Sequence, residues 1–321
     1  MPLLFDMPYD QLATYAGTNP CPSDFDAYWD AALQDVQSRD PCVEIIETDD
    51  FNVSGVTCSH LWFTGVGSAR IHARLLRPER AGAPTPAVLM FHGYSGSCGD
   101  WMGKLGYALA GFTVAAMDCR GQGGLSEDCG GVKGTTLNGH IIRGLDDAPE
   151  KLLYRQIFLD TVQLARVIMS FPSVDETRVG VKGGSQGGGL ALACAALEPR
   201  IKKAAVKFPF LSDYLRTWTI DQAKDAYAEL REFFRRHDPQ HKRETEIFTR
   251  LGYIDIQNLA PRIQAEVLMA TGLSDTICPP STQFAAYNKI NSSKQLEVYP
   301  DFGHEFLPGF RDRVFRFLQE L

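Results

Sequence analysis

The sequence predicts an α/β fold in which a mostly parallel central sheet is covered by helices on both faces. From residue 87 onward, short apolar strand patterns alternate with helical patterns, as in parallel sheets that are buried on both sides. In the same region a serine lies in a glycine-rich turn at residues 183–187, between a predicted strand and a predicted helix. Apolar residues make up 44% and charged residues 22% of the 321 residues, as in folded proteins. We therefore expect a single α/β domain over residues 1–321.

The chain begins with a predicted extension to this sheet, over about residues 1–86. Residues 22–38 have the periodicity of an amphipathic helix, and Ser23 or Asp24 is its expected N-cap. The apolar face of this helix carries Phe25, Tyr28, Trp29, Ala32 and Leu33. We expect this face to pack across the sheet.

Strand patterns follow the helix. Residues 57–64 and 70–77 alternate in polarity around a Gly-Val-Gly turn and predict an antiparallel hairpin. Pro84 and Pro86 then indicate a linker. Beyond the linker, strands are expected at residues 87–91, 113–118, 178–182, 203–208, 266–271 and 295–299. Helices between these strands would cover both faces of the sheet.

Two helical segments stand out between the strands. Residues 154–170 carry apolar side chains at helical spacing, and Pro172 ends the pattern. Residues 211–262 are predominantly helical and rich in charge, which is typical of solvated helix faces. Aromatic residues in the same segment give it apolar surface for docking. We expect a helical insertion before the last strands, placed either as a cap over the site or as a contact between subunits.

The pentapeptide G-G-S-Q-G at residues 183–187 predicts a nucleophile elbow. In such a turn Ser185 would be held in a strained conformation, and the flanking glycines would let the strand and the helix pack closely. The N-terminus of the following helix would direct free N–H groups toward an oxyanion. A phosphate-binding loop is disfavoured, because no Lys-Ser/Thr pair follows the glycines.

A serine nucleophile requires a base and a carboxylate that orients the base. In the α/β-hydrolase architecture these residues follow in the order Ser, Asp or Glu, His, on loops at the carboxyl ends of strands. The expected strand at 266–271 leads into Asp275, and the one at 295–299 leads into His304. Either residue alone could be an ordinary turn residue. Together with Ser185, in the required order, they predict a catalytic triad.

An oxyanion-binding loop is expected at the end of the strand at 87–91. His92 follows that strand and precedes Gly93, as in the His-Gly loop of this architecture. We expect the His92 ring to be a structural hydrogen-bonding group rather than the base. The backbone N–H groups of Tyr94 and Gln186 are the expected oxyanion donors, and the Tyr94 side chain is a candidate wall of the acyl pocket.

Several motifs carry a resemblance to a known family. They are R-G-Q at residues 120–122, G-G-S-Q-G at 183–187 and H-E at 304–305. Residues 1–33, H-G-Y-S-G at 92–96, F-P-F-L-S-D at 208–213 and D-F-G-H-E at 301–305 extend it over nearly the whole chain. With these motifs the sequence resembles carbohydrate esterase family seven, the acetyl xylan esterases and cephalosporin C deacetylases.

The resemblance implies a role for each motif residue. Ser185, Asp275 and His304 would form the triad, and the backbone N–H groups of Tyr94 and Gln186 the oxyanion hole. Arg120 and Gln122 would support the active-site loops; an Arg-Gly turn at a strand end most often joins loops by hydrogen bonds. The family also implies deacetylation of small acetylated sugars, such as acetylated xylo-oligosaccharides, and of cephalosporin C, through an acetyl-serine intermediate in a ring-shaped homohexamer.

Composition and charge exclude several other classes. A formal net charge of −7 disfavours nucleic-acid binding and anionic membranes. We find neither a secretory signal nor an apolar run that could span a membrane, and expect a cytoplasmic protein. The eight cysteines include no C-x-x-C motif and are expected to be reduced thiols. His237 and His241 lack a carboxylate partner of the zincin type, so we expect no metal and no cofactor.

Four alternatives remain beside the sugar esterase. A serine peptidase of the prolyl-oligopeptidase type shares the elbow and the triad order, but its propeller domain would need several hundred more residues. A general carboxylesterase or a metal-dependent esterase is a further alternative. A non-catalytic binding module would not need to keep a nucleophile, a base and an acid together.

Overall fold

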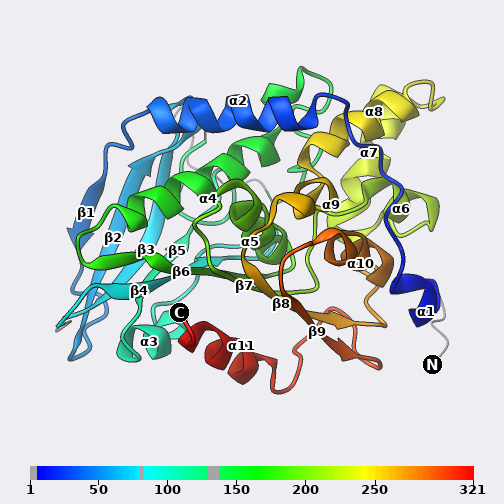
Figure 1. Cartoon of the computed structure of the whole chain (residues 1–321). Coiled ribbons are helices and arrows are strands. Elements are labelled where there is room, and N and C mark those ends of the chain that lie inside the picture. Colours follow the sequence, from blue (N-terminus) through cyan, green and yellow to red (C-terminus); the bar gives the residue numbers. More distant parts are fainter. Residues whose placement is uncertain (1–5, 80–81, 129–136) are drawn as a thin grey trace.

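The computed structural model describes residues 6–79, 82–128 and 137–321 (Figure 1). Its strands are β1 Glu44–Glu47, β2 Val56–Thr64, β3 Arg70–Pro78, β4 Thr85–Phe91, β5 Thr113–Met117, β6 Val174–Gly184, β7 Lys203–Lys207, β8 Glu266–Gly272 and β9 Lys294–Tyr299. Its α-helices are α1 Tyr9–Leu12, α2 Phe25–Ser38, α3 Met102–Leu109, α4 Leu153–Met169, α5 Gln186–Leu197, α6 Tyr214–Thr219, α7 Ala228–His237, α8 Glu244–Leu251, α9 Ile256–Leu259, α10 Pro280–Lys289 and α11 Phe310–Gln319.

The nine strands form one sheet in the order β1-β2-β3-β5-β4-β6-β7-β8-β9. The pairs from β1 to β5 are antiparallel, and all pairs from β5 through β4 to β9 are parallel. The predicted mostly parallel sheet is therefore confirmed, and so is the hairpin that β2 and β3 form. Because the parallel strands run in one direction, their carboxyl ends place the loops after β4, β6, β8 and β9 at one edge.

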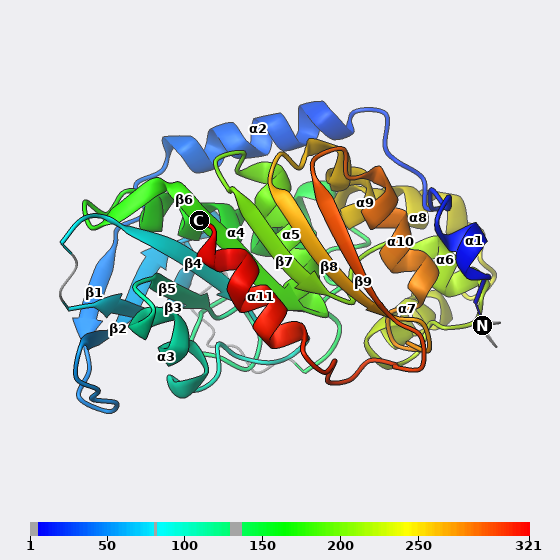
Figure 2. The same ribbon diagram turned by 60° about the horizontal axis from the view of Figure 1, so that its bottom comes forward.

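Helices cover both faces of the sheet, as the sequence predicts. In Figure 1, α2, α4 and α5 lie above the sheet, and α3 and α11 lie below it. The view in Figure 2 shows α11 crossing the strands on its own face and α1 lying beside α10 at the end of the molecule. Among the described helices, none is both long and apolar enough to cross a membrane. The expectation of a single domain stays a prediction.

The N-terminal helix α2 buries the predicted face. Trp29 is fully buried, stacks on Phe158 of α4 at a ring-centroid distance of 6.0 Å and donates its indole N–H to the carbonyl of Tyr253 at 3.0 Å. The predicted N-cap position at Asp24 is confirmed, but the predicted capping hydrogen bond is absent. Asp24 occupies the N-cap, but its carboxylate accepts the hydroxyl of Tyr253 instead of a backbone N–H of the helix.

The sheet departs from the prediction most clearly at Pro86 and at β1. Pro86, expected in a linker, lies inside β4, at the point where the register between β4 and β6 shifts. A proline is tolerated there because an irregularity in pairing removes the need for its missing N–H. Strand β1 was not predicted. All four of its residues are exposed at the edge of the sheet, so no buried face marks it in the sequence.

The predicted helical insertion is confirmed: α6, α7, α8 and α9 lie between β7 and β8. Asp213, at the N-cap of α6, joins this insertion to the N-terminal segment. Its fully buried carboxylate accepts the Tyr15 hydroxyl at 2.7 Å and the backbone N–H groups of Thr18 and Asn19 at 3.1 and 2.9 Å. Asp213 itself has a left-handed backbone conformation, with φ of +48°.

We expect Asp213→Ala to lower the free energy of unfolding by about 3 kcal/mol, because it leaves buried N–H groups without an acceptor. Asp213→Asn keeps one acceptor oxygen and tolerates the left-handed conformation, so its loss should be smaller. Chemical denaturation of the purified variants measures both values. Asp26→Ala removes an exposed partner of Arg262 and should change the value by less than about 1 kcal/mol. If Asp213→Ala lowers the free energy of unfolding no more than Asp26→Ala does, Asp213 does not stabilise the junction between the insertion and the N-terminal segment.

Candidate active site

Ser185 lies on a strained turn between β6 and α5. Its φ and ψ are +56° and −125°, and its backbone N–H donates to the carbonyl of Lys207 at 3.1 Å. A Cβ on Gly183 would lie 2.1 Å from the Gly187 carbonyl oxygen, and a Cβ on Gly187 would lie 2.1 Å from that of Phe91. Only glycine fits at these two positions. The predicted elbow is therefore present, with its serine half-buried at the carboxyl end of β6.

The structure brings Asp275 and His304 together. His304 Nδ1 lies 2.8 Å from Asp275 Oδ2, and the Asp275 carboxylate is fully buried. The other Asp275 oxygen, Oδ1, accepts the backbone N–H groups of Ile277 and Cys278, both at 2.9 Å. These bonds fix the carboxylate, which in turn fixes the orientation of the imidazole. The ring of Phe208 packs against the imidazole at a centroid distance of 4.2 Å.

The thiol of Cys278 lies beside the Ser185 hydroxyl. Within the described residues no hydrogen bond joins this hydroxyl to His304, and in such sites that bond often tightens only when substrate binds. Burial raises the pKa of the Cys278 thiol well above its ordinary value, so the thiol stays protonated beside the serine. The sequence predicts buried, reduced thiols. Cys278 is buried as predicted, whereas Cys21 and Cys42 are exposed, so the prediction is wrong for those two.

The two predicted oxyanion donors have free backbone N–H groups. Among the described residues, the amides of Tyr94 and Gln186 donate no hydrogen bond within the chain. Gln186 begins α5, so its N–H is one of the unpaired donors at the helix N-terminus. Both residues belong to segments that meet at the carboxyl ends of β4 and β6.

The side chain of Gln186 is held by a buried polar network. Gln122 and Gln186 exchange amide hydrogen bonds of 2.9 and 3.1 Å, and the Tyr154 hydroxyl donates to Gln186 Oε1 at 2.7 Å. Gln186 Nε2 also reaches the carbonyls of His92 and Gly93, at 3.4 and 3.3 Å. Gln122 thus supports the start of α5 and, through it, the loop that carries Tyr94.

The side chain of Arg120 joins three elements of the fold. Its guanidinium is fully buried and donates to both oxygens of Asp160 in α4, at 2.7 and 2.6 Å, and to the carbonyl of Val66 at 2.9 Å. These bonds join the end of β5 to α4 and to the β2–β3 turn. The role of Arg120 in supporting the active-site loops stays a prediction.

His92 has both ring nitrogens engaged by the backbone. Nδ1 lies 2.7 Å from the Gly93 carbonyl, and Nε2 accepts the N–H of Cys119 at 3.0 Å. Burial lowers the pKa of His92, which keeps the ring neutral. The prediction that His92 is a structural hydrogen-bonding group is confirmed.

An acidic residue that the sequence did not single out also reaches this site. Glu229 in α7 is buried, and its carboxylate accepts the Tyr94 hydroxyl. Burial raises the pKa of Glu229 to about 7, and that of the Tyr94 phenol above its ordinary value. No local motif marks this contact, because 135 positions separate the two residues.

One group among the described residues has the composition of a metal site: His72, Cys98 and Asp118, whose ligand atoms lie within 4.8 Å of one another. Hydrogen bonds already occupy most of these atoms. His72 bonds with Asp118 at 2.7 Å and with His60 at 2.8 Å, and Asp118 also accepts the backbone N–H of Leu125 at 3.0 Å. We therefore assign these residues to a hydrogen-bond network. The absence of a cofactor stays a prediction.

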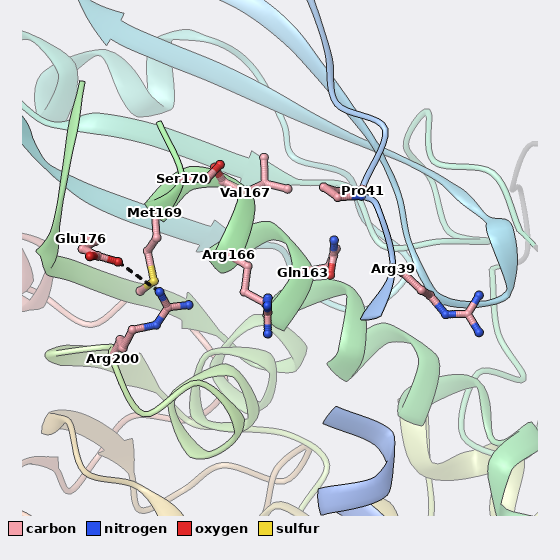
Figure 3. Close-up of a pocket in the computed structure, with 9 residues that line it drawn as sticks. All are labelled: Arg39, Pro41, Gln163, Arg166, Val167, Met169, Ser170, Glu176 and Arg200. Atoms are coloured by element: carbon pink, nitrogen blue, oxygen red, sulfur yellow. Dashed lines mark hydrogen bonds and ion pairs between the residues drawn. The ribbon is translucent and has the colours of Figure 1, made fainter. Parts of the chain in front are cut away.

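A surface pocket of about 360 Å³ lies apart from these residues, between α4, the segment that follows α2 and the start of β6 (Figure 3). Three arginines line it, Arg39, Arg166 and Arg200. Arg200 is paired with Glu176 and Glu198, and Arg39 with Asp35. The pocket contains none of the candidate catalytic residues, and these ion pairs leave little net positive charge in it.

Comparison with known proteins agrees with the geometry. Residues 1–321 match the acetyl xylan esterase (AXE1) family. The structure is similar to that of acetyl xylan esterase 1 from Thermoanaerobacterium sp. JW/SL YS485, with a TM-score of 0.95, 58% identity and coverage of 98% of this chain and 99% of that one. The acetyl xylan esterase from Paenibacillus sp. R4 gives a TM-score of 0.92 and 36% identity, with coverage of 98% and 99%.

A curated relative is longer. Acetyl esterase Axe7A from Xylanibacter ruminicola is 28% identical over 289 residues, which cover 87% of this chain but only 62% of the relative's length. The family match and the two solved structures extend over nearly the whole chain. The protein therefore belongs to the acetyl xylan esterase family, whose members are carboxylic ester hydrolases with the α/β-hydrolase fold.

Proposed function

We propose that the protein is a serine esterase that removes acetyl groups from small acetylated carbohydrates, such as acetylated xylo-oligosaccharides, and from cephalosporin C. The observation that carries this proposal is the Asp275–His304 hydrogen bond of 2.8 Å at the edge of the sheet where the elbow presents Ser185. The family match and the similarity to two solved acetyl xylan esterases support the acetyl ester as substrate.

The proposed reaction has two stages. His304 accepts the proton of the Ser185 hydroxyl as the serine oxygen attacks the acetyl carbonyl, and it then returns that proton to the departing sugar oxygen. Asp275 holds the imidazole in the required tautomer and stabilises its cationic form. Water, activated by the same histidine, then cleaves the acetyl-serine and releases acetate.

In both stages negative charge develops on the acetyl carbonyl oxygen. The free backbone N–H groups of Tyr94 and Gln186 supply two donors for it, and the start of α5 adds the positive end of a helix dipole. Gln122 and Tyr154 hold the Gln186 side chain, so they act through the position of the donor. Removing a donor of this kind costs roughly 10²–10³ in rate.

The assembly and the cellular location are also proposals. We propose a homohexamer whose enclosed active sites admit small substrates, and a cytoplasmic protein without nucleic-acid or membrane partners. The net charge of −7 supports the absence of nucleic-acid partners and of anionic-membrane partners. Family resemblance supports the hexamer. Sedimentation of the purified protein measures its assembly.

We expect Ser185→Ala to reduce acetate release from acetylated xylo-oligosaccharides by roughly 10⁴-fold or more, because the nucleophile is lost. Enzymatic assay of free acetate measures this loss. Ser54→Ala, at an exposed position distant in sequence from the elbow, should keep wild-type turnover. Full activity of Ser185→Ala would disprove the serine mechanism. A wild type that cleaves a small activated acetate but no acetylated sugar would retain the hydrolase and refute the carbohydrate assignment.

We expect Asp275→Asn to fold and to lower kcat by roughly 10⁴-fold, because an amide favours the wrong imidazole tautomer. Steady-state kinetics and circular dichroism of the variant measure the two properties. Retention of more than about a tenth of the wild-type kcat would remove Asp275 from the proposed triad.

Substrate size gives a third test. If the active sites face an enclosed interior, acetate should be released from short acetylated xylo-oligosaccharides much faster than from intact acetylated xylan. Parallel assays at equal acetyl concentration measure the ratio. Equal rates on the two substrates would contradict the enclosed assembly and leave the esterase assignment in place.

A further inference from the structure

Glu229 is a buried acid that the proposed mechanism does not use. It belongs to α7, in the helical insertion, and only 6% of its surface is exposed. One carboxylate oxygen, Oε1, accepts the hydroxyl of Tyr94. The other, Oε2, accepts the backbone N–H groups of Ile141 and Ile142, at 2.6 and 3.0 Å. All three contacts are donations to the carboxylate, which is the arrangement that suits its ionised form.

These contacts join three segments that are distant in the sequence. Tyr94 lies in the loop after β4, Ile141 and Ile142 lie between β5 and α4, and Glu229 comes from the insertion between β7 and β8. The carboxylate is thus a single point at which the insertion meets the loop that carries an expected oxyanion donor.

Several other contacts also hold the loop after β4, including the bonds from Gln186 to the carbonyls of His92 and Gly93. Ser95 has a left-handed conformation, with φ of +57°, and a backbone bond of 3.1 Å joins Gly96 to Gly93. The Tyr94 ring packs edge-on against His140 and Phe210, at centroid distances of 4.8 and 5.7 Å. Ring packing allows the side chain to slide, whereas a hydrogen bond from its hydroxyl fixes it in register. An oxyanion donor is effective only within a few tenths of an ångström of its place.

We propose that Glu229 is a positioning residue for ester hydrolysis: by holding the Tyr94 hydroxyl it fixes the loop whose backbone N–H meets the oxyanion, and so makes turnover depend on the docked insertion. This inference rests on the proposed function, because the oxyanion role of Tyr94 belongs to it. Glu229 acts through Tyr94 and touches no reacting atom.

The charge state of Glu229 makes the inference testable. Burial raises its pKa to about 7, above its ordinary value of 4.5. The carboxylate that accepts all three donors therefore prevails above pH 8, and the protonated form, which has lost an acceptor, prevails below pH 6. The positioning should be complete on the alkaline side and lost as the pH falls through about 7.

Four titratable groups that face Glu229 from neighbouring segments have pKa values shifted away from this interval. Burial lowers the pKa of His140 to about 4 and raises those of Tyr94, Tyr154 and Tyr214 above their ordinary values. On the solvent side, the cavity beside Glu229 carries the charged side chains of Asp225, Glu232 and Arg236. The proposed base His304 is present in the wild type and in both variants, so a ratio of their rates cancels its contribution.

The experiment compares kcat for hydrolysis of 4-nitrophenyl acetate by wild type and Glu229→Gln from pH 5.5 to 8.5. At pH 8.5 the variant should be about 10- to 100-fold slower with KM changed less than threefold, because the interaction is made in the transition state. The ratio of wild-type to variant kcat should fall toward 1 below pH 6, where the wild type is itself protonated. Glu232→Gln, one turn away on an exposed part of α7, should keep a ratio near 1 throughout.

A ratio that stays constant from pH 5.5 to 8.5, or a loss entirely in KM, would overturn the inference. Tyr94→Phe cuts the same contact from the other side and should show the same pH-dependent ratio. If Glu229→Gln does not fold, the pH dependence of Tyr94→Phe tests the inference instead.

The double variant should be no slower than the slower single variant. Additive losses would show that the two residues do not act through the same hydrogen bond. Wild-type hydrolysis of the activated ester without release of acetate from acetylated sugars would refute the proposed substrate and leave this test intact.

Discussion

The close approach of β6, α5 and β4 at the elbow is the constraint on which the rest of the site depends. A Cβ at Gly183 or Gly187 would lie about 2 Å from a carbonyl oxygen, so no other residue allows this packing. The approach places Ser185 at a left-handed φ of +56°. Such a conformation costs of the order of 1–3 kcal/mol and persists only where surrounding contacts over-determine it. Helix α5, buried at all of its positions from Gln186 to Leu197, supplies those contacts.

Buried polar groups extend this rigidity outward from the elbow. Gln186 is held by Gln122 and Tyr154, and the Arg120–Asp160 pair joins β5 to α4 with both side chains fully buried. Such groups are costly unless every donor and acceptor is used, since breaking one member leaves an unpaired polar group in the core. The R-G-Q motif therefore has two separate structural tasks. Arg120 joins β5 to α4 and to the β2–β3 turn, whereas Gln122 holds Gln186, the residue that follows Ser185.

Local patterns predicted most elements of the fold. Strands with buried faces and the amphipathic helix α2 require apolar residues at a regular spacing, which can be recognised in the sequence. They also predicted where Ser185, Asp275 and His304 lie relative to strand ends, since the order of residues in this architecture follows the topology. Three features were not predictable in this way. Strand β1 is exposed throughout, Pro86 is tolerated by a register shift in a partner strand, and Glu229 meets Tyr94 only in the folded chain. Each depends on a neighbour that is distant in the sequence.

Asp213 and Glu229 show why a helical insertion of this kind can influence a site built on the sheet. Asp213 anchors the start of the insertion to the N-terminal segment, and Glu229 anchors α7 to the loop after β4. Both use a carboxylate that accepts several donors at once, so each side chain fixes more than one segment for a single buried charge. The sheet by itself fixes the positions of the strand ends. It leaves the residues of the loops that follow them less precisely placed. In the proposed mechanism the oxyanion donor must be placed more precisely than the sheet alone can place it. Contacts from the insertion would supply that additional precision.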